Sequence, residues 1–271
     1  MLRRAAARSL CCAALLLASV VGAQSTQPVS PRPAASRPAR GKGPRKPALC
    51  RQVKTKADLP VPASRRYTLG AAELIARHAF HGARGAAHRL QVAIAGRETP
   101  LVAPARREGW AAPAARVADA LAALPDAARM LVKRVEINPV PNPEDGWWTR
   151  KYGMRVVAGM TADSEGVLRV YPRGLKQPRP VLVRNMMHEV GHIWSNRTYG
   201  SRRGPWTAWR KAIASDPAVP SLYATAAVTE DAAEATALYL STIGTEEHER
   251  YRAKLPARFA LLAKVLPHRA P

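Results

Sequence analysis

Two histidines four residues apart, His188 and His192, restrict what the chain around them can form. They enclose Glu189 in the sequence His188-Glu189-Val190-Gly191-His192. Residues i and i+4 of an α-helix are neighbours, with Cβ atoms about 5–6 Å apart, so both imidazoles can bind one zinc ion from the same face. Zinc lowers the pKa of a bound water to about 7, and Glu189 is placed to take its proton. We therefore predict a helix with His188 and His192 as zinc ligands and Glu189 as general base, against the alternative of a surface helix with two chance histidines.

A catalytic zinc site needs a third protein ligand, which has to come from elsewhere in the chain because no histidine follows shortly after His192. The segment 229–240 carries Glu230 and Glu234 four residues apart, on a helical face that is otherwise rich in Ala and Leu. Burying an unpaired carboxylate is costly. One glutamate is therefore expected to bind zinc, and the other to accept the second N–H of a zinc-bound histidine. The spacing does not distinguish the two, Asp231 is a rival carboxylate, and a solvated acidic patch is the alternative.

The first 23 residues have the pattern of a secretory signal peptide. Arg3, Arg4 and Arg8 precede an apolar stretch over 10–21, and small residues follow it. This stretch is shorter than the roughly 20 residues that span a bilayer. We expect a secreted or periplasmic protein without a transmembrane segment after signal removal, and an uncleaved anchor is the alternative.

Residues 24–66 are rich in Pro, Arg, Lys, Ser and Ala, with one acidic residue, Asp58. Proline interrupts helical periodicity, and such a composition buries too little apolar surface to offset its ordering entropy. We predict a disordered basic tail that either holds the protein on an anionic envelope polymer or serves as a solvated linker. Cys50 is the one cysteine outside the signal sequence, so no internal disulfide is expected.

Residues 67–271 are predicted to form one domain of the α+β class. Its N-terminal part is Ala-rich and predicted to be helical over 69–95 and 114–130, with a bend at Pro125. A small antiparallel sheet follows, then the active-site helix and a C-terminal helical subdomain. The expected strands cover 132–140, 154–161 and 167–171, with a hairpin loop at 162–166, and the expected helices cover 180–196, 205–215, 221–242 and 245–266.

The motif at 188–192, with Tyr223 seven residues before Glu230 and the second glutamate Glu234, resembles the lethal-factor-type zinc peptidases. This group includes the anthrax lethal factor catalytic domain and the secreted Pro-Pro endopeptidases, and the resemblance is strongest over 132–271. It implies a zincin-like fold, with Glu230 as third zinc ligand and Tyr223 as a phenol donor to the developing oxyanion. Where the family often has bulky aromatic residues between the two glutamates, this chain has Asp, Ala and Ala.

Candidate substrate-binding residues precede the active-site helix. Zinc peptidases of this general design hold substrate as an extra strand at a sheet edge, and we expect 167–171 to be that edge, with Arg169 favouring acidic peptides. Trp147 and Trp148 follow a Pro-rich bend. Exposed Trp side chains stack on proline rings or sugars, and packing under a lid is the alternative. The histidines at 78, 81 and 88 are expected on a helix, as structural or surface residues.

These features predict a secreted zinc endopeptidase, with Zn²⁺ as cofactor and a Pro-rich or acidic protein or peptide as substrate. Two alternatives stay open. The net charge of +24 suits a non-catalytic protein that binds an anionic envelope polymer or nucleic acid. A zinc hydrolase that acts on peptidoglycan cross-links would use the same metal ligands.

Overall fold

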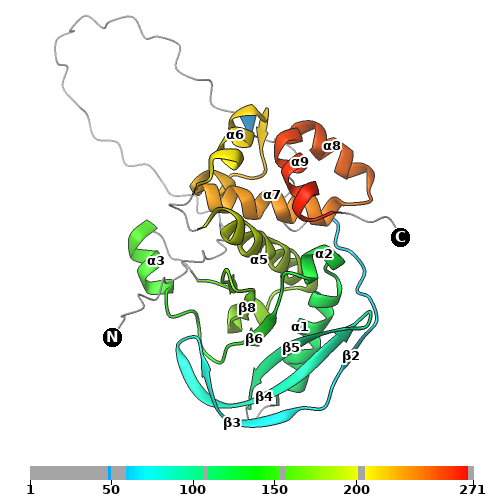
Figure 1. Ribbon diagram of the computed structural model, residues 1–271. Coiled ribbons are helices and arrows are strands. Elements are labelled where there is room, and N and C mark those ends of the chain that lie inside the picture. Colours follow the sequence, from blue (N-terminus) through cyan, green and yellow to red (C-terminus); the bar gives the residue numbers. More distant parts are fainter. Residues whose placement is uncertain (1–47, 50–58, 106–108, 153–156, 201–204, 268–271) are drawn as a thin grey trace, which may run out of the picture.

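The computed structural model describes residues 48–49, 59–105, 109–152, 157–200 and 205–267 (Figure 1). A sheet lies on one side of the molecule, the helix that carries the motif runs beside it, and the C-terminal helices lie beyond that helix (Figure 1). The fold is a mixed one of helices and sheet, compatible with the predicted α+β class.

The main sheet has seven strands: β2 (Tyr67–Leu69), β3 (Glu73–Phe80), β4 (Ala83–Ile94), β5 (Arg97–Pro104), β6 (Arg134–Ile137), β7 (Met160–Ala162) and β8 (Val167–Val170). Their order is β2-β4-β5-β6-β8-β7, with β3 also paired to β4. The β5–β6 and β6–β8 pairs are parallel, so the sheet is mixed and the predicted antiparallel sheet is wrong. Separately, β1 (Ala48–Leu49) pairs in parallel with β9 (Ala218–Val219).

Helices cover one face of the sheet and extend away from it. They are α1 (Ala111–Ala122), α2 (Asp126–Arg129), α3 (Asp145–Tyr152), α4 (Pro172–Leu175), α5 (Arg179–Tyr199), α6 (Thr207–Ser215), the 3₁₀-helix η2 (Tyr223–Ala226), α7 (Val228–Thr242), α8 (Glu246–Lys254) and α9 (Pro256–Val265). Both α1 and β7 contact α5, and α7 packs along the length of α5 on the side away from the sheet. Helices form in all four segments predicted after residue 180, but 221–242 is divided into η2 and α7, and 245–266 into α8 and α9. The helix predicted over 114–130 with a bend at Pro125 is divided there into α1 and α2.

The helix predicted over 69–95 is wrong, because this Ala-rich segment forms β2, β3 and β4. Two tight turns reverse the chain, one at Gly82, with φ +85°, and one at Ala95-Gly96, with φ values of +49° and +76°. Positive φ at both central residues is the geometry of a two-residue hairpin turn. Along the end of β4 every second residue is buried, so burial of one strand face outweighs the helix propensity of alanine.

The disorder predicted for 24–66 is wrong at its C-terminal end. Residues 59–66 pack along the domain, where Leu59 is buried and the Arg65 N–H donates to the Ala122 carbonyl at 3.1 Å. The Leu59 carbonyl accepts a hydrogen bond of 2.6 Å from the buried Arg184 guanidinium. The signal-like segment, most of the predicted tail and Cys50 lie outside the described residues.

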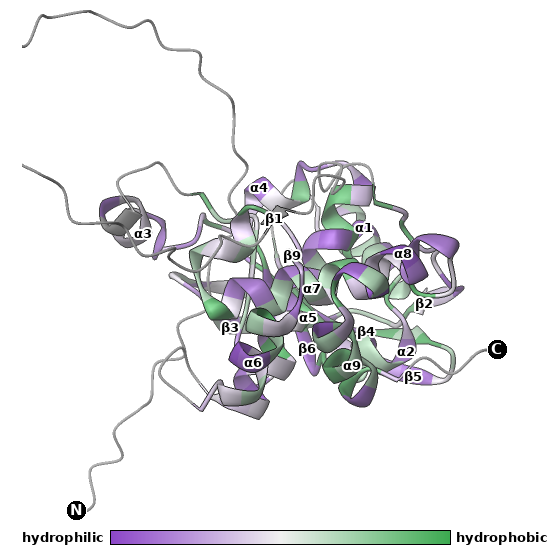
Figure 2. Ribbon diagram, turned by 90° about the horizontal axis from the view of Figure 1, so that it is seen from above, coloured by the Kyte–Doolittle hydropathy of each residue, from purple (hydrophilic) through white to green (hydrophobic). Residues whose placement is uncertain are grey.

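The apolar core lies between the sheet and the helices packed on it. The sheet contributes Leu101, Val135, Leu168 and Val170 to this core. Helix α1 contributes side chains such as Leu121, and α5 contributes side chains such as Leu182. Figure 2 shows that α8, on the outside, is largely hydrophilic. None of the helices in the described part of the chain combines the length and apolarity needed to span a bilayer.

A buried ion cluster joins α7, α9 and the segment before β9. Arg258, which is 0% exposed, donates two hydrogen bonds of 2.7 Å to Asp231 and one of 3.0 Å to Asp216. The indole of Trp209 donates to the same Asp231 carboxylate at 2.9 Å. This cluster fixes Asp231 on the side of α7 that faces away from α5.

We expect Arg258→Met to lower the free energy of unfolding by about 3–5 kcal/mol, because it leaves two buried carboxylates without their cation. The matched control is Arg252→Met on α8, where the pair with Glu249 is solvent-exposed and contributes about 0–1 kcal/mol. Urea denaturation of both variants measures the difference. Equal stabilities for the two variants would contradict a structural role for the cluster.

Candidate metal centre

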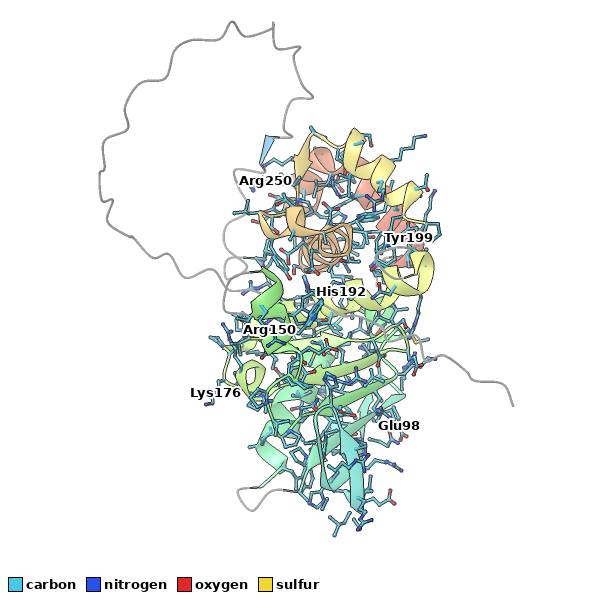
Figure 3. All side chains as sticks on the ribbon, turned by 90° about the vertical axis from the view of Figure 1, so that its left-hand side faces the viewer. Glu98, Arg150, Lys176, His192, Tyr199 and Arg250 are labelled. Carbon is cyan, nitrogen blue, oxygen red and sulfur yellow. The ribbon has the colours of Figure 1, made fainter. Side chains whose placement is uncertain are left out.

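The motif lies in the middle of α5, in a part of this helix that is fully buried. Every residue from Leu182 to Asn196 is buried, because the sheet covers one side of α5 and α7 covers the other. Figure 3 shows His192 in the interior of the molecule, between the sheet and the C-terminal helices. A surface helix with two chance histidines does not describe this segment.

At Gly191 the helices α5 and α7 approach each other closely. A Cβ atom at this position would lie 2.6 Å from Cα of Ala233 and 3.0 Å from Cβ of Thr236. No side chain fits there without moving one of the helices. Ala233, one of the small residues between the two glutamates of α7, belongs to this close contact.

Three side chains from the two helices converge on one point. His188 Nε2 and His192 Nε2 lie 3.2 Å apart, and Glu230 Oε2 lies 3.4 Å from the first and 3.6 Å from the second. All three residues are at most 2% exposed. Among the described residues, this is the one group of three His, Cys, Asp or Glu side chains that could hold a metal ion.

The distances fit a tetrahedral metal site. Zinc bonds of about 2.0–2.1 Å place two tetrahedral ligand atoms about 3.3 Å apart, which is close to all three sides of the triangle. Among the described residues the buried Glu230 carboxylate accepts no well-formed hydrogen bond, and its polar neighbours are the two Nε2 atoms at 3.4 and 3.6 Å. A buried carboxylate in that situation is costly unless a cation pairs with it, so the residues present fit a divalent metal.

The two glutamates on α7 have different partners. Glu234 Oε1 lies 2.8 Å from His188 Nδ1, so the Nδ1–H group donates to it and the Nε2 lone pair stays available for a metal. Glu230 faces the two Nε2 atoms. Burial alone would raise the pKa of the Glu230 carboxyl, but the imidazoles of His192 and His188 hold it well below its ordinary value. Asp231, the rival carboxylate, faces Arg258 on the other side of the helix.

The two remaining predicted catalytic residues border this group. Glu189 follows His188 in α5 and is fully buried. Tyr223, in η2, stacks near the His188 imidazole, with ring centroids 6.0 Å apart and planes at 29°. The structure thus brings five of the predicted site residues, and Glu234 with them, to one place between α5, α7 and η2.

The predicted substrate-binding residues lie differently from the expectation. Strand β8 pairs with β6 on one side and with β7 on the other, so the edge strand is β7 and the prediction for 167–171 is wrong. The Arg169 guanidinium donates to Asp163 at 2.8 Å on the sheet. Trp147 and Trp148 lie in helix α3 and not in a loop; Trp147 is 42% exposed and Trp148 is buried.

A polar group that the sequence did not reveal lies on the sheet near its β7 edge. Glu136, which is buried, faces His78 Nε2 at 3.3 Å, and His81 Nδ1 lies 2.7 Å from the Tyr171 hydroxyl. The helix predicted for His78 and His81 is wrong, and no spacing rule along the sequence connects these histidines to Glu136 or Tyr171. The apolar alternation along β4 was the signal that could have placed His78 and His81 on a hairpin.

Comparison of the chain with protein-family models, with curated proteins and with solved structures found no match.

We expect Gly191→Ala to lower the free energy of unfolding by about 1–3 kcal/mol, the usual effect of overpacking, and to weaken metal binding because α5 and α7 have to separate. The matched control is Gly146→Ala in α3, where a Cβ would meet nothing closer than an Arg150 side-chain nitrogen at 3.6 Å. That variant should gain up to about 1 kcal/mol from helix propensity. Thermal unfolding with and without zinc tests both, and a stable zinc-binding Gly191→Ala variant would contradict the close contact.

The two glutamates should differ in their effects on metal affinity. Glu234→Ala removes the hydrogen bond that orients His188, which typically weakens metal binding about 10–100-fold. Glu230→Ala removes a ligand, and we expect it to abolish stoichiometric binding. Competition with a chromophoric chelator measures both affinities. A larger loss with Glu234→Ala than with Glu230→Ala would reverse the two assignments.

Proposed function

We propose that the protein is a zinc-dependent endopeptidase. The observation that carries this proposal is the buried triangle of His188, His192 and Glu230, with Glu189 beside it in the same helix. Two imidazole nitrogens and one carboxylate oxygen are a donor set that suits zinc, and three protein ligands leave the fourth position that catalytic sites keep open. A structural zinc site would instead use four protein ligands.

The chain's own residues supply the rest of the reaction. Bound zinc would polarise the substrate carbonyl and lower the pKa of water to about 7. Glu189 takes the proton from the attacking water and later gives it to the leaving amine. The Tyr223 hydroxyl donates a hydrogen bond to the oxyanion that develops on the carbonyl, where it stabilises charge that is present in the transition state and absent from the substrate.

The arrangement of elements supports a zincin-like fold of the lethal-factor type. In this proposal α5 is the active-site helix, α7 provides the third ligand, and the edge strand β7, which contacts α5, holds an extended peptide by backbone hydrogen bonds. In the same proposal, the partly exposed Trp147 on α3 contacts an apolar or proline-containing substrate.

We further propose that the enzyme acts outside the cell. Residues 1–23 have the composition of a signal peptide. The basic, proline-rich residues up to 58 would then hold the enzyme on an anionic envelope polymer by an attraction that weakens with salt.

Glu189→Gln is the decisive variant, because it keeps the size of the side chain and removes the base. We expect it to bind one zinc ion per chain and to lose about 10²–10⁴-fold in kcat/KM. The matched control is Glu165→Gln in the exposed turn between β7 and β8, which should keep full activity. Metal analysis is paired with cleavage of a peptide library, with and without a chelator.

The outcomes separate the proposal from its two rivals. Zinc-dependent digestion of purified cell wall without peptide cleavage would replace the endopeptidase with a peptidoglycan hydrolase. Unchanged behaviour of Glu189→Gln in every assay, with binding to an anionic polymer that falls steeply with salt, would establish the non-catalytic alternative. Purified wild-type protein without stoichiometric zinc would remove the mechanism altogether.

A further inference from the structure

The side chain of Tyr171 connects elements that the proposed mechanism needs to keep in place. It follows β8, is 0% exposed, and its hydroxyl lies 2.7 Å from His81 Nδ1 and 3.0 Å from Thr161 Oγ1. Thr161 is the central residue of the edge strand β7, and His81 lies in the turn between β3 and β4. One hydroxyl therefore joins the sheet edge to a hairpin 90 residues earlier in the chain.

The backbone of Tyr171 makes further connections to the same region. Its N–H donates to the Gly159 carbonyl at 3.0 Å, directly before β7, and its carbonyl accepts from the Leu175 N–H in α4 at 3.2 Å. Helix α4 leads into α5, which carries the metal ligands. Tyr171 thus stands between the edge strand and the start of the metal helix and holds both.

The protonation states allow this set of hydrogen bonds at neutral pH. Burial lowers the pKa of His81 and the charge of Arg169 lowers it further, against smaller opposing effects of Glu144 and Glu136. The imidazole is then neutral at pH 7, and Nδ1 can accept from the Tyr171 hydroxyl. Burial also raises the pKa of the Tyr171 hydroxyl, against opposing effects of the Thr161 hydrogen bond and of Arg169 and with a smaller increase from the Glu189 carboxylate. The hydroxyl therefore stays protonated at neutral pH.

The hairpin turn is itself fixed from outside. At Gly82, next to His81, a Cβ atom would lie 3.1 Å from Pro143 Cγ, so the turn rests on the segment that leads into α3. Strand β7 has three residues and a single partner strand. The hydrogen bond between the Tyr171 hydroxyl and Thr161 is therefore a side-chain contact that adds to the short backbone ladder of β7.

We propose that Tyr171 is a positioning residue for peptide cleavage, which holds the edge strand β7 at a fixed place beside the metal helix through its bonds to Thr161 and His81. This inference rests on the proposed function for its activity readout. The underlying claim, that loss of the Tyr171 hydroxyl loosens β7, is independent of the proposed function.

The test compares Tyr171→Phe with the matched control Tyr239→Phe. Tyr239 is also buried, and its hydroxyl donates to the Leu266 carbonyl at 3.3 Å. Both variants should hold one zinc ion per chain. For a long peptide that spans the cleaved bond on both sides, Tyr171→Phe should raise KM about 5–20-fold, as expected for two lost hydrogen bonds, with kcat within about twofold. Tyr239→Phe should leave KM unchanged. Equal KM values in the two variants, or loss of zinc in Tyr171→Phe, would overturn the proposal.

A second pair of variants keeps the proposal testable if Tyr171→Phe does not fold. Thr161→Val removes one of the two hydroxyl partners and should raise KM, whereas Thr161→Ser keeps the hydroxyl and should behave as wild type. A wild-type KM for Thr161→Val, or the same KM change in both variants, would count against the proposal.

Hydrogen exchange of the whole protein provides a readout that needs no activity. The amides of the 157–163 segment should exchange at least about fivefold faster in Tyr171→Phe than in Tyr239→Phe, because opening of β7 becomes easier. If wild-type protein cleaves no peptide, the proposed function fails, and this exchange comparison alone decides the role of Tyr171. Unchanged exchange would overturn it.

Discussion

The contact between α5 and α7 at Gly191 is the constraint on which the candidate site depends. Glu230 Oε2 on α7 lies 3.4 and 3.6 Å from the two Nε2 atoms of α5 because no side chain separates the backbones at Gly191. The same contact removes the carboxylates from water, so that their partners have to be imidazole nitrogens and, in the proposal, a cation. The close contact of α5 with α7 and the buried charges of the site therefore occur together. Either alone would be unfavourable, since helices this close need small residues and carboxylates this deep need counter-charges.

Helix α7 has no solvent-exposed face over most of its length, and its acidic residues are divided between two environments. Glu230 and Glu234 face α5, while Asp231 faces Arg258 and Trp209. The ion cluster around Arg258 ties α7 to α9, which lies on the side opposite α5. This anchoring fixes the rotation of α7 about its own axis, and the rotation decides which glutamate reaches the two Nε2 atoms.

Much of the site could be predicted from the sequence, and the reasons for the successes and failures are physical. The i, i+4 spacing of His188 and His192 determines their common face in any α-helix, so local geometry was sufficient. Glu230 and Glu234 share a face by the same rule and could not be distinguished, because the difference arises from which nitrogen of His188 each one meets. The strands before residue 95 were mistaken for a helix because alanine favours helices locally, whereas burial against α1 is a tertiary effect. The bond between His81 and Tyr171 joins residues 90 apart, which no local pattern encodes.

The stretch from Leu59 to Arg66 changes where the folding unit of this chain begins. Its carbonyl at Leu59 receives the guanidinium of Arg184, one helical turn before His188, and the charge of that guanidinium has been taken almost wholly out of water. A polypeptide started at Tyr67, as composition alone would suggest, would remove a carbonyl partner from this buried cation, which lies one helical turn before His188. Shortening the chain by those few residues would therefore disturb α5 close to the candidate metal ligands, through a hydrogen bond at Arg184 and not at the ligands.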